Sequence, residues 1–204
     1  MLVEPPSDAR LLELDRAVVE ALAARLQGGA RTGPDADAIA LRTLLTGSVD
    51  RTASAMVRAM LGRIDAASGD AITVCGPMAG LLAADRFGAV NALVADPDAA
   101  LAGVRSGGRA LIDLATARPW WGRLLAMPDL RVVAALPDDA VSRPRVLMVS
   151  QAKPGPTGDD RTFWVTDSPS PEAHIVERLA RAGLVATMVH AAGGLKLFML
   201  TGYV

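Results

Sequence analysis

The sequence is poor in aromatic residues and nearly free of cysteine. Phe, Trp and Tyr make up 3% of the 204 residues, and acidic and basic residues almost balance, with a formal net charge of -1. A nucleic-acid interface needs a basic face and aromatic side chains on which bases stack, so we expect no nucleic-acid partner. The single cysteine, Cys75, has no partner for an internal disulfide, which favours a reducing, cytoplasmic location.

Long apolar runs and clustered metal ligands are also lacking. No run approaches the roughly 20 apolar residues that a membrane-spanning helix needs, so we expect no membrane partner. The N-terminus, MLVEPPSDAR, lacks the basic start and apolar stretch of a signal peptide. Cys75, His174 and His190 are too few and too scattered to form a zinc site, and we expect neither a metal nor another cofactor.

Hydrophobic residues, by contrast, make up 51% of the chain, enough for a packed core. In the N-terminal third they recur at three- and four-residue spacing from Leu11 to Leu26, before the helix-ending pair Gly28-Gly29. Similar spacing predicts helices over residues 37–45 and 49–67. Residues 1–68 are therefore predicted to form a short helical segment.

From residue 69 onward, short apolar runs alternate with helical patterns and turn residues. Strands are predicted at 72–75, 90–95, 110–114, 131–136, 145–150, 161–166, 185–190 and 196–200. Helices are predicted at 78–87, 98–105, 118–127 and 170–182. The alternation of strands and helices is typical of an α/β domain, 69–204, and over residues 72–127 it favours parallel strands joined by right-handed crossovers.

Several segments resemble known families. The helix LLELDRAVVEALAARLQ, residues 11–27, resembles the first helix of the all-helical chorismate mutases, with Asp15 and Arg25 at the positions of that family's aspartate and arginine. GPDADAIALRTLL is similar to the second helix of that family, and residues 49–70 take the place of the third.

The rest of the chain resembles prephenate dehydratase in the order of its elements. The similar segments are CGPMAG, ALVADPDAALAGVRSGGRALIDLA, WWGRLLAMPDLRVVAALP, RPRVLMVS and GDDRTFWV. Residues 164–204 look like a shortened ACT-type regulatory module. The resemblance implies a chorismate mutase-like protein of alphaproteobacterial type, in which a helical mutase segment precedes a periplasmic-binding-protein-like α/β domain with a small ACT-like C-terminal part.

What the resemblance implies for function is the isomerisation of chorismate to prephenate in aromatic amino-acid metabolism. Arg25 and Arg42 would bind the substrate's carboxylates, and Asp37 is a nearby polar group on the second helix. The lysine that such enzymes place on the ether oxygen has no counterpart, because the only lysines are Lys153 and Lys196. The alternative is a non-catalytic relative that binds or senses an aromatic-pathway carboxylate.

Three places in the α/β domain are candidate ligand sites. Gly76 precedes a helix whose N-terminal N–H groups favour an anion, although such turns are common without a ligand. Thr116 and Trp120 lie in the loop IDLATARPWW, where the tryptophan either lines a pocket or anchors packing.

The third place is the end of a Gly/Pro-rich loop, which delivers Asp160, Arg161 and Thr162 to the start of a strand and suits either a binding site or a salt bridge. A dehydratase needs threonine before arginine here, and the order is reversed, so we do not expect that activity. The expected partners are a small-molecule carboxylate and a second copy of the chain. The helical segment is short for a core of its own, and the resemblance to chorismate mutases implies dimerisation, for which the apolar stripe from Leu11 to Leu26 offers a face.

Overall fold

The computed structural model describes residues 34–45, 51–68, 70–88, 92–116, 118–139 and 142–204, together with Arg16 and Glu20. The N-terminal part contributes α2 (Pro34–Leu45) and α3 (Arg51–Ser68), which pack through a small cluster around Val57 and Leu61. Asp15 and Arg25 of the predicted first helix lie outside the described residues. Among the described residues, no helix is both long and apolar enough to cross a membrane.

A five-stranded mixed sheet forms the centre of the protein, with strand order β2-β1-β3-β5-β4. Its elements in chain order are β1 (Ile72–Cys75), α4 (Pro77–Phe87), β2 (Leu93–Val94), α5 (Pro97–Arg105), β3 (Arg109–Asp113), the 3-10 helix η1 (Trp120–Ala126), β4 (Arg131–Leu136) and β5 (Val146–Ser150). The apolar runs are strands because both faces of the sheet are covered, and all five residues of β5 are buried.

The predicted parallel pairing is correct for β2, β1 and β3. The sequence predicted no direction for β5. This strand runs antiparallel to both β3 and β4. The connection between β4 and β5 is too short for the crossover that parallel neighbours require, so the two strands form a ribbon. The predicted helix at 118–127 is instead the shorter η1, which lies between Pro119 and Pro128.

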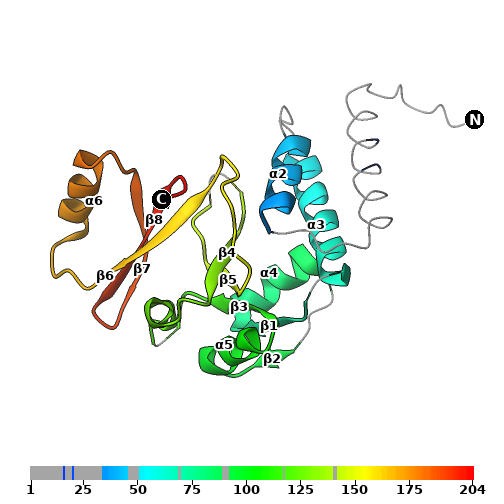
Figure 1. Ribbon diagram of the computed structural model, residues 1–204, viewed down its shortest axis with the longest axis horizontal. Coiled ribbons are helices and arrows are strands. Elements are labelled where there is room, and N and C mark those ends of the chain that lie inside the picture. The colour runs from blue at the N-terminus through cyan, green and yellow to red at the C-terminus, as the bar shows by residue number, and fades with distance from the viewer. Residues whose placement is uncertain are drawn as a thin grey trace, which may run out of the picture.

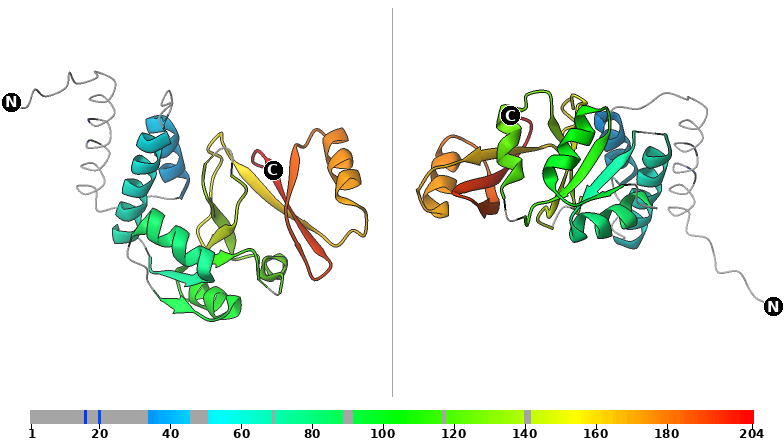
Figure 2. Two further views of the ribbon diagram at one scale, coloured as in Figure 1. Left: turned by 180° about the vertical axis from the view of Figure 1, so that it is seen from behind. Right: turned by 90° about the horizontal axis from the view of Figure 1, so that it is seen from below.

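A second, antiparallel sheet closes the chain with the order β6-β8-β7. It consists of β6 (Arg161–Thr166), α6 (Glu172–Arg181), β7 (Ala186–Ala192) and β8 (Leu195–Thr201). The boundary expected at residue 164 falls within β6. Figures 1 and 2 show this sheet and α6 at one end of the molecule, α2 and α3 at the other, and the β4–β5 ribbon between them.

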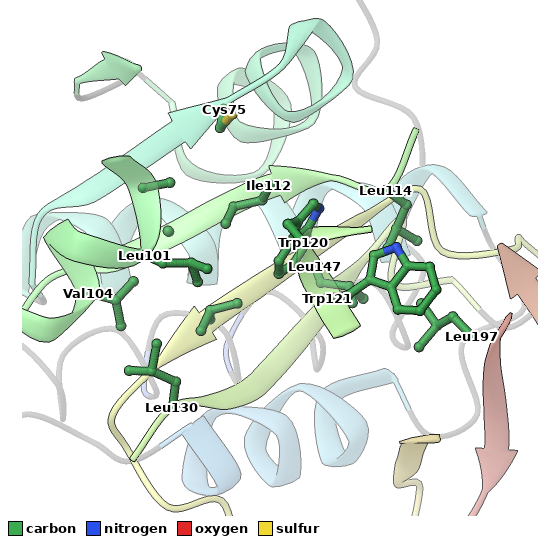
Figure 3. Close-up of a cluster of buried hydrophobic side chains, with 13 residues drawn as sticks. Cys75, Leu101, Val104, Ile112, Leu114, Trp120, Trp121, Leu130, Leu147 and Leu197 are labelled. Carbon is green, nitrogen blue, oxygen red and sulfur yellow. The ribbon is translucent and has the colours of Figure 1, made fainter. Parts of the chain in front are cut away.

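The main apolar cluster joins the two sheets. It contains residues of α5, β3 and β5 together with Trp120 and Trp121 of η1 and Leu197 of β8 (Figure 3). Trp120 is 1% exposed and Trp121 2% exposed. Because η1 contributes side chains to both sheets, it fixes the second sheet against the first.

Candidate functional site

A cavity of about 1120 Å³ lies around the β4 strand, between α2 and α3 on one side and the second sheet on the other. All six residues of β4, which forms an edge of the central sheet, line this cavity. Cavities at the junction of structural units are a common location for small-molecule sites, and this volume slightly exceeds the usual range for such ligands.

Positive charge predominates on the cavity wall. The cationic side chains that line it are Arg42, Arg58, Arg86, Arg109, Arg131, Lys153 and Arg161, and the acidic ones are Asp65, Asp70, Asp138, Asp159 and Asp160. Among the described residues, basic groups therefore exceed acidic groups by two. A cleft lined by an excess of one sign attracts ligands of the opposite sign.

Three of these arginines, from three different elements, meet at the turn that follows β4. Arg58 Nε of α3 lies 3.5 Å from one carboxylate oxygen of Asp138, and Arg86 Nε of α4 lies 3.4 Å from the other. Arg161 Nη2 of β6 donates a hydrogen bond of 3.2 Å to the carbonyl of the next residue, Asp139. One carboxylate thus faces two guanidinium groups, with a third beside it.

Burial leaves hydrogen-bond donors at this turn unused. Arg58 Nε and Arg86 Nη1 are buried without a hydrogen-bond acceptor among the described residues. Burial lowers the pKa of Arg86, an effect that Asp138 and Asp65 oppose. A buried guanidinium with an unused N–H is destabilised, so further negative charge near it is favourable.

Arg161 is half-buried in the cavity wall and, within the described part of the chain, forms no salt bridge. The carboxylate of its neighbour Asp160 turns away into the preceding loop. There it accepts hydrogen bonds from Thr157 N and Oγ1 and from Gly158 N, at 2.7 to 3.0 Å. Arg161 therefore retains donors that pair with no carboxylate of the described residues.

Asp160 organises the loop that it ends. Its burial would raise the pKa of the carboxyl group, but the hydrogen bonds from Thr157 and Gly158 and the charge of Arg42 outweigh this and lower it. Arg42 of α2 lies against the same loop, where a Cβ on Gly158 would come within 2.4 Å of its Nη1 atom. The fold therefore brings the predicted residues Arg42, Asp160 and Arg161 to one wall.

Thr162, the last of this predicted group, also lines the cavity. Its hydroxyl donates to the Gly202 carbonyl at 2.8 Å and accepts from Val204 N at 3.1 Å. It thus ties β6 to the chain that follows β8. Arg25 lies outside the described residues, and for Asp37 only the backbone, within α2, is described.

The other predicted ligand residues, Gly76, Thr116 and Trp120, do not line this cavity. Trp120 donates its indole N–H to the Asp113 carbonyl at 2.7 Å, and Thr116 donates its hydroxyl to the Arg118 carbonyl at 2.6 Å. Both contacts hold the loop between β3 and η1 in place.

Gly76 directly precedes the helix α4, whose N-terminal N–H groups bind a carboxylate of the protein itself. The buried carboxylate of Asp113 accepts hydrogen bonds from the backbone N–H of Met78 and of Ala79. Gly76 has φ 102° and ψ 156°, and a Cβ there would lie 2.4 Å from Asp113 Cγ. The absence of a side chain at Gly76 is what lets Asp113 approach.

Sequence analysis did not identify Arg58, Arg86 or Asp138 as candidate site residues. Arg86 follows Asp85 near the end of a helix whose other residues are apolar or small, which was the available signal. Asp138 follows the proline after β4, a position that reads as an ordinary turn. Their proximity depends on how α3 and α4 pack against the end of β4, and a linear pattern does not record this.

Searches with the chain find no matching protein-family model, no matching curated protein and no matching solved structure.

Proposed function

We propose that the protein binds a small-molecule carboxylate in the cavity beside β4, with Arg161 as the principal contact. The observation that carries this proposal is a half-buried guanidinium that lines a cavity and has no carboxylate partner among the described residues. Arginine presents several N–H donors in a planar fork that matches a carboxylate. The positive charge of Arg58 and Arg86 at the adjacent turn supports the same ligand class.

Calorimetric titration with succinate and with its uncharged analogue succinamide tests this proposal. The two compounds have nearly the same size and shape, so a difference between them reports the negative charge. We expect saturable binding of succinate that weakens as sodium chloride is added, because salt screens the attraction, and no binding of succinamide. Equal binding of both compounds, or of neither, would contradict the proposal.

We further propose that the central sheet belongs to a periplasmic-binding-protein-like fold and the second sheet to an ACT-like part. The mixed α/β architecture supports the first, with α4 and α5 as crossovers between the parallel strands β1, β2 and β3. The β6-α6-β7-β8 order, in which a single helix accompanies a three-stranded antiparallel sheet, supports the second.

A second candidate function is the isomerisation of chorismate to prephenate, in keeping with the resemblance of residues 1–68 to chorismate mutases. One observation favours it: Lys153 lines the same cavity as Arg42, although it is far from it in the sequence. The Lys153 amine would supply the hydrogen-bond donor for the substrate's ether oxygen, which the helical segment lacks. The alternative is a non-catalytic role, in which the protein binds such a carboxylate in the same cavity and senses it without isomerising it.

The loss of chorismate absorbance distinguishes these two roles. If the protein is an enzyme, turnover should be detected and should disappear in Arg25→Ala and in Lys153→Met. It should persist in Arg123→Gln, whose side chain is exposed and away from the cavity. If the intact protein binds chorismate without turning it over, the isomerase role is excluded and the sensing role remains.

The proposed form of the protein is a cytoplasmic homodimer, joined through the leucine stripe of residues 11–26. The short helical segment supports this, because the cluster between α2 and α3 contains only two buried apolar residues, Val57 and Leu61, among the described ones. Light scattering coupled to size exclusion measures the mass directly, and a mass of one chain at all concentrations would contradict it.

A further inference from the structure

The cavity has an apolar wall that begins next to Arg161. Side chains alternate between the two faces of a strand, so Arg161, Phe163 and Val165 lie on one face of β6. All three line the cavity, and Phe163 and Val165 also pack against the main apolar cluster. Leu197, opposite Val165 in the register with β8, extends the same wall.

The cavity has further apolar lining on η1 and β4, and together with the strip on β6 and β8 it forms an apolar compartment. This lining consists of Trp121 and Leu124 of η1 and Val132 and Ala135 of β4, all of which line the cavity and belong to or pack against the main cluster. Figure 3 shows Trp121 next to Leu197, which places η1 and β8 together here. Four residues along a strand span about 13 Å, so the strip from Arg161 to Val165 is long enough for more than a carboxylate alone.

We propose that this compartment binds the apolar body of an amphipathic acid whose carboxylate is held at Arg161. The inference rests on the proposed function and adds to it the class of ligand. A cation at one end of a continuous hydrocarbon wall is complementary to a molecule with an acid at one end and hydrocarbon at the other. A small hydrophilic acid pairs with the Arg161 guanidinium but makes no contact with the apolar wall.

A homologous series of acids separates the two parts of the site. Acetate, butyrate, hexanoate and octanoate carry the same carboxylate and differ only in buried hydrocarbon. Each CH₂ that enters an apolar compartment contributes about fourfold in affinity. We expect the dissociation constant to fall by about that factor per CH₂ from butyrate onward. Cyclohexanecarboxylate and phenylacetate, titrated in parallel, show whether a cyclic or an acyclic body fits better, and either order supports the compartment.

Two variants distinguish the head-group contact from the apolar wall. Arg161→Gln should lower the affinity for every acid by the same factor and leave the dependence of affinity on chain length unchanged. Ala135→Leu adds hydrocarbon to the compartment from β4, where Ala135 is half-buried. It should abolish the gain in affinity that longer chains show relative to acetate. Phe163→Ala, which removes wall instead of filling space, should reduce that gain if Ala135→Leu folds poorly.

The outcomes for this inference and for the proposed function are different. A series in which short acids bind and chain length has no effect would overturn the apolar compartment and leave the carboxylate site intact. No binding of any acid would overturn both. Leu81→Ala, which changes an exposed leucine away from the cavity, should retain the full dependence on chain length, and its loss in this control would also contradict the assignment to β4 and β6.

Discussion

Replacing Gly76 by alanine is expected to lower the free energy of unfolding by about 3 kcal/mol, from the combined costs of a glycine-only backbone conformation and an overpacked core site. The backbone at Gly76 has φ 102° and ψ 156°, a region that side chains strongly disfavour. The added methyl group would lie 2.4 Å from both Asp113 Cγ and Oδ2. Asp113 cannot simply move aside, because its carboxylate holds the N-terminus of α4.

Urea denaturation followed by circular dichroism measures this effect, and Gly80→Ala is the matched control. Gly80 lies four residues later in α4, and a Cβ there would meet nothing within 4 Å. Alanine at this helical position should stabilise the protein by up to about 1 kcal/mol. Equal stability of Gly76→Ala and the native protein would show that Asp113 does not occupy the end of α4 as described.

Replacing Arg161 by glutamine is expected to weaken succinate binding by about thirtyfold, since a hydrogen bond to a charged group contributes about 2 kcal/mol. Glutamine keeps a polar side chain of similar reach but loses the charge and the paired donors. The β6–β8 pairing at Arg161 uses backbone groups, so the strand itself should be unaffected. Arg161→Lys, which retains the charge without the planar fork, should give an intermediate loss.

Calorimetric titration checks this prediction, with Arg123→Gln as the control. Arg123 is also an arginine, but its side chain is 52% exposed, pairs with Asp98 and does not line the cavity. We expect its removal to leave succinate binding unchanged. Equal losses in the two variants would mean that overall charge, not the position of Arg161, governs binding.

Much of the secondary structure was predictable because it depends on neighbouring residues. The strands 72–75, 131–136 and 161–166 have the predicted bounds, and α4 and α5 begin one residue earlier than predicted, at Pro77 and Pro97. A short apolar run bounded by turn residues specifies a strand, and a proline in the first turn of a helix is compatible with its start. Contacts between distant segments therefore change the boundaries of these strands and helices little.

The candidate site was only partly predictable. Asp160, Arg161 and Thr162 are identifiable from a loop that ends at a strand, because that signal is local. Arg58, Arg86 and Asp138 come together only when α3, α4 and the turn after β4 pack against one another. This packing leaves no periodic pattern in the sequence. The same holds for Asp113, which approaches the end of α4 because the parallel strands β1 and β3 are neighbours.

The sequence alone therefore determined the mixed succession of helices and strands, their approximate ends and the loop that carries Arg161, since each follows from hydrophobic spacing and turn residues within a few positions. Tertiary structure decided the antiparallel direction of β5, the anion that occupies the end of α4 and the cavity beside β4. These features depend on which distant segments become neighbours when apolar surface is buried, and burial is a property of the whole fold.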